Sequence, residues 1–229
     1  MNQETRRRLV YGRRQGHRLR GRQAELMHSR LPALRLDCPQ DESLEPRDLF
    51  DFAAGNIWLE IGFGGAEHLL AQAIAHPEHG FIGCEPFVNG VAKLLAGIET
   101  HDLHNIRIHD GDARDVLESL KPHSLERIFL LFPDPWHKKR HNKRRFVSSE
   151  NLDQMARVLK PGGILRIASD IPDYIRWTLV HMQGRDDFLW QATGPAHWRC
   201  RPADWPETRY EAKALKQGRT PVYLSFQRQ

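Results

Sequence analysis

Residues 57–77 read IWLEIGFGGAEHLLAQAIAHP and contain the pattern of a strand, a tight turn and a helix. The first part, Ile57–Ile61, is a short apolar run of the kind that fills a strand buried on both faces of a parallel sheet. Glycines follow it, and the apolar residues at 69, 70, 73 and 74 then share one face of a helix that Pro77 ends. This stretch therefore predicts one strand–helix unit of an α/β fold.

The alternation of strand-like and helix-like segments continues on both sides of this unit. Further helices are expected at 44–52, 88–98, 116–120, 146–159 and 174–182. Strands are expected at 57–61, 81–84, 106–108, 128–132, 164–168, 188–192 and 222–226. Repeated strand–helix units predict a doubly wound, mostly parallel, seven-stranded Rossmann-like sheet of the α/β class. The last two strands lack a crossover helix between them and allow an antiparallel edge.

The composition fits one globular domain with an appended arm. The chain has 229 residues, of which 40% are hydrophobic and 28% charged, and its three cysteines show neither disulfide-framework nor metal-binding spacing. We expect a domain at 41–229 and a basic, mobile arm at 1–40. No apolar run approaches the roughly 20 residues that span a bilayer, and no apolar stretch of the kind found in secretion signals follows the Arg-rich N-terminal residues. A cytoplasmic protein with no membrane partner and no obligate protein partner is expected.

The formal net charge of +5 is distributed unevenly along the chain. Residues 1–30 carry nine arginines against two glutamates, a net charge of +7, and residues 138–145 add +6, which leaves −8 for the rest. Two separate basic clusters on an otherwise acidic chain indicate a directed electrostatic surface, for which a nucleic-acid backbone is the natural ligand. The alternative for the N-terminal segment is a disordered tail that only increases solubility.

A stiff turn and a dense basic run follow the strand expected at 128–132. Asp134 lies between two prolines, whose fixed φ angles restrict the turn, and open α/β sheets bind ligands at the carboxyl ends of their strands. Six of the eight residues at 138–145 are Lys or Arg, which favours a polyanion beside this carboxylate, with a solvated charge run as the alternative. His137 and His141 are four residues apart, but no carboxylate separates them and cations surround them, so we expect no metal there.

Glycines and acids after three successive strands indicate a site for an adenosine-containing ligand. Gly62 and Gly64 permit positive φ angles and close approach of a ligand to the amides of the next helix. Position 67 is Glu instead of the third glycine of a dinucleotide fingerprint, which disfavours NAD and FAD. Glu85 can accept both hydroxyls of a ribose, and Asp112 can face an adenine edge. Each of these features has a simpler alternative when it is considered alone. The glycine turn could be purely structural, and each acid could be a helix cap or a surface charge.

These motifs resemble those of a known family. The stretch FPDPWHKKRHNKRRF at 132–146 closely resembles the signature of the bacterial tRNA (guanine-N7-)-methyltransferases. The glycine turn and the acids resemble those of the class I S-adenosylmethionine-dependent methyltransferases. The resemblance covers about residues 56–226 and departs from the family pattern at Ala66, where relatives usually have another glycine.

The resemblance implies a set of site residues, with S-adenosylmethionine as methyl donor, tRNA as substrate and no metal. The residues that match the family's cofactor-binding acids are Glu60, Glu85, Asp112 and Asp134. Asp134 also matches the catalytic position. The residues that match contacts with tRNA are Lys138, Asp170, Thr208, Arg209, Tyr210 and Glu211.

The implied reaction places a methyl group on N7 of guanine 46 in the tRNA variable loop. N7 carries an in-plane lone pair and no proton, so it can attack the sulfonium methyl without a general base, and positioning should dominate. Asp134 would then orient the guanine by accepting from its N1–H and 2-amino group. Two other classes stay open, an RNA-binding protein with a degenerate cofactor pocket and a methyltransferase that acts on a protein or a small metabolite.

The segment PADWPETRYE at 202–211 is expected to form a stiff loop that leads into a helix. Thr208 and Glu211 have the spacing of a capping box, which predicts a helix through Ala214. We expect the loop to hold Thr208 and Arg209 over the mouth of the pocket beside Asp170, where they would contact RNA. An ordinary surface turn is the alternative.

Overall fold

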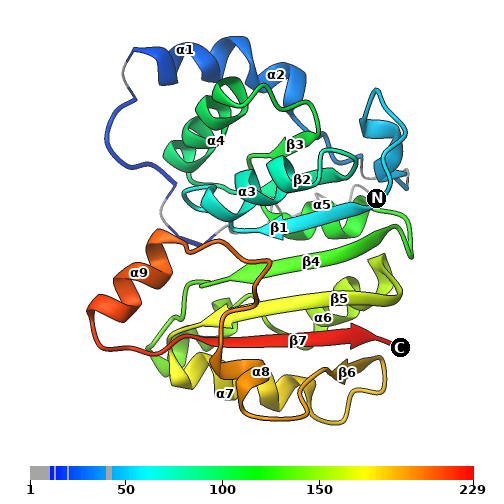
Figure 1. Cartoon of the computed structure of the whole chain (residues 1–229), viewed down its shortest axis with the longest axis vertical. Coiled ribbons are helices and arrows are strands. Elements are labelled where there is room, and N and C mark those ends of the chain that lie inside the picture. The colour runs from blue at the N-terminus through cyan, green and yellow to red at the C-terminus, as the bar shows by residue number, and fades with distance from the viewer. Residues whose placement is uncertain (1–10, 13, 20, 40–42) are drawn as a thin grey trace, which may run out of the picture.

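The computed structural model describes residues 11–12, 14–19, 21–39 and 43–229. Within these residues a seven-stranded sheet has the order β3-β2-β1-β4-β5-β7-β6 (Figure 1). The strands are β1 (Ile57–Ile61), β2 (Gly80–Cys84), β3 (Ile106–His109), β4 (Leu125–Leu131), β5 (Leu159–Ser169), β6 (Phe188–Trp190) and β7 (Val222–Arg228). Strands β1 to β5 pair in parallel, whereas β7 runs antiparallel to both β5 and β6. The predicted mostly parallel Rossmann-like sheet is confirmed, with its antiparallel strand second from the edge.

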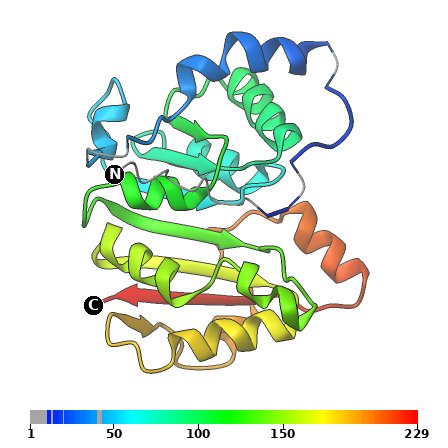
Figure 2. The same ribbon diagram turned by 180° about the vertical axis from the view of Figure 1, so that it is seen from behind.

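Helices cover both faces of the sheet. One face carries α3 (Glu67–Ala75) and α4 (Val88–Thr100), with α1 (Arg22–Ser29) and α2 (Leu31–Leu34) packed outside them. The other face carries α5 (Ala113–Ser119), α6 (Ser149–Val158) and α7 (Pro172–Met182), which lie in front of the sheet when it is seen from behind (Figure 2). Shorter helices are η1 (Pro46–Leu49), η2 (Lys139–Arg144), α8 (Ala196–Arg199) and α9 (Arg209–Lys216). No helix in the described part of the chain is long and apolar enough to cross a membrane.

Strand β1 lies inside the sheet, between β2 and β4, and is buried along its whole length. Ile57, Leu59 and Ile61 join the core on the side of α5 and α6, whereas Trp58 joins the core on the side of α3 and α4. This alternation follows from the two-residue period of a strand. Full burial of one such side chain contributes about 1.5–3 kcal/mol, so β1 fixes firmly the position of the glycine turn that follows it.

Several element boundaries differ from the prediction for physical reasons. Strand β4 ends at Leu131, because Phe132 adopts a φ of 50° and leaves the extended conformation. Strand β5 begins at Leu159 and not at 164, because the chain remains in the sheet through a register shift opposite Leu125, with Gly162 at a φ of 81°. The helix expected at 44–52 is only the short η1.

Part of the predicted N-terminal arm packs on the domain. Leu26, Leu31 and Leu36 are each no more than 2% exposed, and α1 lies along α4, where Arg22 forms an ion pair with Glu99. Leucine burial therefore joins residues 21–36 to the packed body, so the boundary predicted at residue 40 is too late for this segment. Residues 1–10 lie outside the described residues, and the mobility of the arm stays a prediction.

Candidate cofactor and nucleic-acid site

Acidic residues occur at the ends of five neighbouring parallel strands. Glu60 lies in β1, and Glu85, Asp112, Asp134 and Asp170 follow β2, β3, β4 and β5. Because these strands are parallel and adjacent, their carboxyl ends meet at one edge of the sheet, where this fold binds ligands. Burial raises the pKa of Glu85 above its ordinary value, and the negative charges of Asp134 and Glu60 raise it further. These three acids are therefore close enough to interact.

The turn after β1 has the backbone geometry for which glycine is suited. Gly62 and Gly64 have φ angles of 74° and 53°. A Cβ atom at Gly62 would meet no heavy atom of the described residues within 4 Å, so this face of the turn is open to a ligand. Ala66 has a φ of 67°, a left-handed conformation that costs a non-glycine residue about 1–2 kcal/mol. This cost explains why glycine is the usual residue at the position where the chain departs from the family pattern.

Glu85 holds the glycine turn in place. Its Oε2 accepts a hydrogen bond from the Gly64 amide at 2.6 Å, and its Oε1 accepts one from the Phe87 amide at 2.9 Å. A carboxylate offers about four acceptor positions, so each oxygen retains capacity for one more donor. Glu85 can therefore order the turn and still accept hydrogen bonds from two ribose hydroxyls.

Glu60 contacts a protein group that the sequence did not reveal, whereas Asp112 is a helix cap, an alternative that the sequence analysis left open. The Oε2 atom of Glu60 lies 2.7 Å from Nδ1 of His68 on α3, and both side chains are buried. Asp112 caps α5 by accepting from the Arg114 amide at 3.0 Å, and its carboxylate also forms an ion pair with the Arg114 guanidinium. Both acids therefore position elements of the site, and their direct contact with a cofactor stays a prediction.

A cavity of about 450 Å³ lies between α4 and the N-terminal segment, and its lining includes Pro86, the residue after Glu85. Its lining residues are Arg14, Gln15, Met27, Pro86, Val88, Val91 and Asp110. The volume lies within the range of small-molecule sites, and the apolar wall suits a heteroaromatic ring. An open glycine turn, a carboxylate with spare acceptor capacity and this cavity together fit an adenosine-containing cofactor.

The turn that carries Asp134 has an unusual backbone. Phe132 and Trp136, on either side of the Pro-Asp-Pro sequence, have φ angles of 50° and 44°, which are rare for bulky side chains. Strained backbone of this kind collects at functional sites, where the surrounding structure must maintain it. Asp134 is exposed, but the partial burial of its carboxyl raises its pKa above the ordinary value. These observations support the predicted role of Asp134 as a working carboxylate.

The turn is anchored from beneath by Arg145, which the sequence analysis counted in the basic run. Arg145 is only 3% exposed, donates from Nε to the Pro135 carbonyl at 2.8 Å and forms an ion pair with Asp173. Its guanidinium carbon also lies 5.0 Å from the ring centroid of Trp177. Arg145 therefore holds the Pro-Asp-Pro turn from inside the protein and is not part of a polyanion-binding surface.

Other cations of the run face solvent. Lys138, Lys139, Arg140 and Lys143 are exposed, on or beside η2. None of these four forms an ion pair with an acid among the described residues. Their charges are available to phosphate groups, as the sequence analysis expected of this segment.

The predicted start of a helix at Thr208 is confirmed, and one of the two hydrogen bonds of the predicted capping box is observed among the described residues. The Glu211 amide donates to Oγ1 of Thr208 at 3.3 Å, and α9 begins at the next residue after this threonine. Both side chains are buried, and Glu211 also accepts from the Tyr223 hydroxyl at 2.5 Å. Their observed contacts fix the position of α9, and their predicted contact with tRNA stays a prediction.

Arg209 and Tyr210 lie against the glycine turn. Nε of Arg209 is 3.5 Å from Oε1 of Glu67, and a Cβ atom at Gly64 would lie 2.9 Å from the Tyr210 ring. Asp170 instead forms an ion pair with Arg219, after α9. The structure therefore places Arg209 beside the start of α3 and not beside Asp170, because α9 folds back over the first strand–helix unit.

The described N-terminal residues cross the edge of the sheet where the acids converge, and no sequence motif revealed this. We call residues 11–12 and 14–17 the strap. The strap binds the start of α4, where the Arg14 carbonyl accepts from the Val88 amide at 3.0 Å and Asn89 Oδ1 accepts from the Gly16 amide at 2.7 Å. A Cβ atom at Gly12 would lie 3.4 Å from Oδ2 of Asp134. The dark blue strap runs past the carboxyl ends of the strands in Figure 1.

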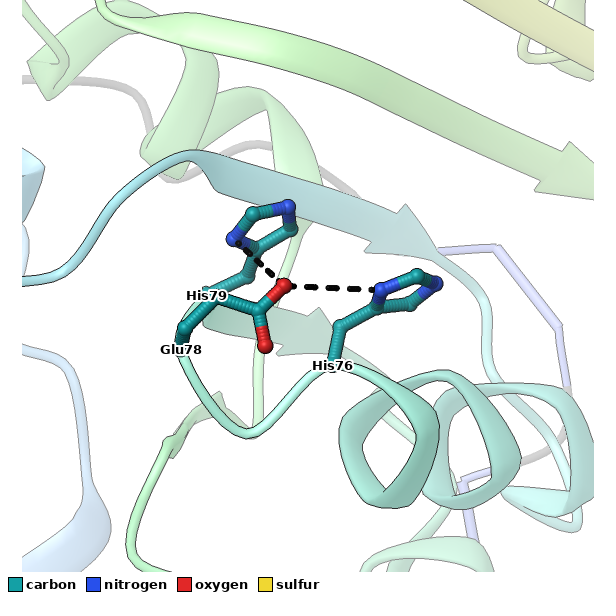
Figure 3. A group of neighbouring side chains, drawn as sticks. All are labelled: His76, Glu78 and His79. Carbon is teal, nitrogen blue, oxygen red and sulfur yellow. Dashed lines mark ion pairs between the residues drawn. The ribbon is translucent and has the colours of Figure 1, made fainter.

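A separate cluster of possible metal ligands lies at the other end of the strands (Figure 3). His76, Glu78 and His79 connect α3 to the start of β2, whereas Glu85 follows the end of this strand. Oε1 of Glu78 is 3.6 Å from Nδ1 of His76 and 3.5 Å from Nδ1 of His79. Trp58 packs edge-on against both histidine rings. Ion pairing and ring packing account for this cluster, which contributes nothing to the site around Asp134.

Sequence comparison finds close relatives over nearly the whole chain. The model of a family described as "Putative methyltransferase" matches residues 54–224. A tRNA (guanine-N(7)-)-methyltransferase of Rhodospirillum rubrum is 52% identical, with coverage of 95% of this chain and 87% of the relative. A protein of the same name from Mesorhizobium japonicum is 51% identical, with coverage of 95% and 94%.

Solved structures with a similar fold are much more distant in sequence. The 16S rRNA methyltransferase KamB aligns with a TM-score of 0.52 and 15% identity, over 76% of this chain and 88% of that chain. A precorrin-6y C5,15-methyltransferase from Geobacter metallireducens aligns with a TM-score of 0.52 and 14% identity, over 77% and 81%. At such identities the likeness concerns the fold alone, and it agrees with the Rossmann-like sheet of methyltransferases.

Proposed function

Because the chain belongs to the family of the tRNA (guanine-N7-)-methyltransferases, we propose that it transfers a methyl group from S-adenosylmethionine to N7 of guanine 46 in the tRNA variable loop. One observation carries this proposal. A strained turn presents Asp134 between the acid-lined cofactor edge of the sheet and the exposed cations of η2. The proposal includes a cytoplasmic location, where tRNA is available.

The residues of the site fit S-adenosylmethionine, which supplies an electrophilic methyl group on a positively charged sulfur. The turn is open at Gly62, whereas the Tyr210 ring lies against Gly64, and Glu85 retains acceptor capacity for the ribose. The charges of Asp134 and Glu60 raise the pKa of Glu85, and this concentration of acids at one edge of the sheet favours a cationic ligand. Asp112 is the proposed contact for the adenine, at the end of β3.

The reaction asks the protein mainly for positioning. Guanine N7 has a lone pair and no proton, so the chain needs no general base and no metal for this transfer. Alignment of two reacting groups can supply up to about 7–11 kcal/mol in ideal cases. Asp134 is suited to accept from the guanine N1–H and 2-amino group, and its negative charge would stabilise the positive charge that the purine acquires. Its carboxyl must be ionised to do so.

RNA contacts are proposed on both sides of Asp134. Lys138 and its neighbours on η2 offer exposed cations to phosphates. Arg209 and Tyr210, which lie over the glycine turn, would contact the ribose-phosphate near the target, and Thr208 with Glu211 would hold them there. Asp170, at the end of β5, is a further proposed contact.

Transfer of tritium-labelled methyl groups tests the proposal against the two other classes. The purified protein, S-adenosylmethionine and an unmodified tRNA transcript should give label in the RNA. A protein that binds tRNA but transfers no label would be an RNA-binding protein with a degenerate pocket. Label that enters only a protein or a small metabolite, without competition by tRNA, would indicate a different methyltransferase.

A further inference from the structure

Trp136 belongs to an aromatic and cationic cluster beside Asp134. The ring centroids of Tyr11 and Trp136 are 6.1 Å apart at an interplanar angle of 75°. The guanidinium carbon of Arg144 lies 4.5 Å from the Tyr11 centroid and 5.0 Å from the Trp136 centroid. Tyr11 comes from the strap, whereas Trp136 and Arg144 come from the turn and from η2. Segments far apart in the sequence therefore meet at the proposed target position.

The strap contacts both Asp134 and Trp136. Gly12 approaches the Asp134 carboxylate with a φ of 113°, a conformation that glycine adopts readily, and the preceding Tyr11 then lies on the cluster. Tyr11 is still 39% exposed, so its ring is not locked into a core. Asp134 itself is exposed, so a guanine can approach it from solvent, whereas a base can stack on Trp136 and Arg144 only if Tyr11 leaves the cluster.

The cluster that remains without Tyr11 has the composition of a site for an unpaired base. Aromatic rings and the planar guanidinium of arginine are the groups on which proteins stack unpaired bases of RNA. Nε of Arg144 is shielded from water and has no hydrogen-bond partner among the described residues. A buried donor without an acceptor is unfavourable, and a base or ribose-phosphate oxygen would relieve this. The strained φ of 44° at Trp136 also indicates that the position of its ring is maintained at a cost.

We propose that Trp136 and Arg144 form a stacking site for an unpaired base of the tRNA, and that Tyr11 fills this site in the free protein. The inference rests on the proposed function, because it takes tRNA as the substrate. The Tyr11 ring then occupies the position of the base, and binding of tRNA displaces this ring.

Direct binding measurements test the stacking site. Affinity for an unmodified tRNA transcript is measured by fluorescence anisotropy with S-adenosylhomocysteine present, so that no methyl transfer occurs. Loss of one base–aromatic stack should raise the Kd of Trp136→Ala by about 5- to 150-fold, and Trp136→Phe should recover most of the affinity. Trp190→Ala is the control, because Trp190 is a partly exposed tryptophan (39%) that lies on the edge strand β6 and not in the cluster around Trp136. Equal Kd values for Trp136→Ala and Trp190→Ala would overturn the inference.

Two further variants keep the test decisive if Trp136→Ala proves unstable in a thermal scan. Arg144→Lys keeps the charge but loses the stacking plane, so tRNA binding should weaken. Tyr11→Ala should strengthen tRNA binding, because it removes the competing ring, whereas Tyr11→Phe should behave as the wild type. Unchanged binding by Arg144→Lys would contradict the stacking site. Weaker binding by Tyr11→Ala would show that Tyr11 belongs to the bound state and would refute its displacement.

The measured methyl transfer separates failure of this inference from failure of the proposed function. If the wild type neither binds nor methylates tRNA, the proposed function is wrong. If the wild type methylates tRNA while Trp136→Ala keeps the wild-type KM for tRNA, only the stacking site is wrong. Affinity for S-adenosylhomocysteine should stay within about twofold of the wild type in Trp136→Phe, which separates a contact with tRNA from a general disturbance of the site.

Discussion

Replacement of Glu85 by glutamine tests the cofactor site at its best-defined side chain. Each carboxylate oxygen already accepts one backbone amide, from Gly64 at 2.6 Å and from Phe87 at 2.9 Å. Glutamine keeps one acceptor oxygen and replaces the other with an NH2 group. Because this NH2 group is a donor, it cannot accept a hydrogen bond from the backbone amide that it faces. The proposed contacts with the ribose lose the negative charge and one acceptor.

The expected loss of affinity follows from the strength of these hydrogen bonds. A hydrogen bond to a charged group contributes about 1.5–3 kcal/mol, so the loss of one should raise the cofactor Kd by about 10- to 150-fold. Glu85→Ala removes both acceptors and leaves the buried Gly64 amide without its partner, so its effect should be larger. Glu150→Gln, on the exposed first turn of α6, is the matched control and should keep the wild-type affinity.

The pH dependence of folding stability gives an independent check of the same residue. Burial raises the pKa of Glu85 in the folded protein above its ordinary value of 4.5. The folded state then binds a proton at Glu85 more tightly than the unfolded state does. Protonation of Glu85 therefore stabilises the fold fully below the pKa that Glu85 has in the unfolded chain, and this stabilisation is lost as the pH rises through its pKa in the folded protein. Glu85→Gln should lack this decline, which urea unfolding at a series of pH values would show.

Isothermal titration calorimetry with S-adenosylhomocysteine at neutral pH measures the affinity directly. The wild type, the two Glu85 variants and Glu150→Gln are compared after a thermal scan has shown that each is folded. An unchanged Kd in both Glu85 variants would refute the placement of the cofactor ribose at the end of β2.

Three further predictions concern the RNA side of the site and its chemistry. Lys138→Gln combined with Arg140→Gln should weaken tRNA binding and reduce the salt slope by about one unit for each lost phosphate contact, and an unaltered slope in filter binding would make η2 a merely solvated surface. The value of kcat/KM should fall as the pH is lowered through the raised pKa of Asp134, because only the ionised carboxyl accepts from guanine, so a pH–rate profile that is flat down to its ordinary pKa of 3.8 would contradict this role. Arg209→Ala should raise the KM for tRNA with little change in cofactor affinity, and a selective loss of cofactor affinity would place α9 on the other side of the site.

The sheet was predictable because its central strands are short apolar runs with clear ends. Ile57–Ile61 was predicted with its observed bounds, since all five residues are buried. The position of β7 between β5 and β6 could not be predicted, because antiparallel pairing depends on contacts between segments and not on the composition of either strand. Helix α1 was missed for a similar reason: the arginines of residues 1–30 indicate an exposed arm, and only packing on α4 buries Leu26.

The location of the site could be predicted from the sequence, but most of the contacts that its acids make could not. Strand ends and glycines locate Glu85 and Asp134 at one edge, because the topology of a parallel sheet requires it. The partners of these acids come from segments whose approach depends on tertiary structure. His68 binds Glu60 across a turn, and the strap reaches Asp134 from the N-terminus. A basic run likewise cannot show from its composition that Arg145 is internal.

The most direct test of the proposed function is mass-spectrometric mapping of the methylated nucleoside in an unmodified tRNA transcript. After incubation with S-adenosylmethionine, the wild type should produce 7-methylguanosine at position 46. Asp134→Asn should be folded but slower by at least about 10-fold, because loss of a charged hydrogen bond costs about 1.5–3 kcal/mol. A methyl group on another atom or another nucleotide, or wild-type turnover by Asp134→Asn, would contradict the proposed reaction.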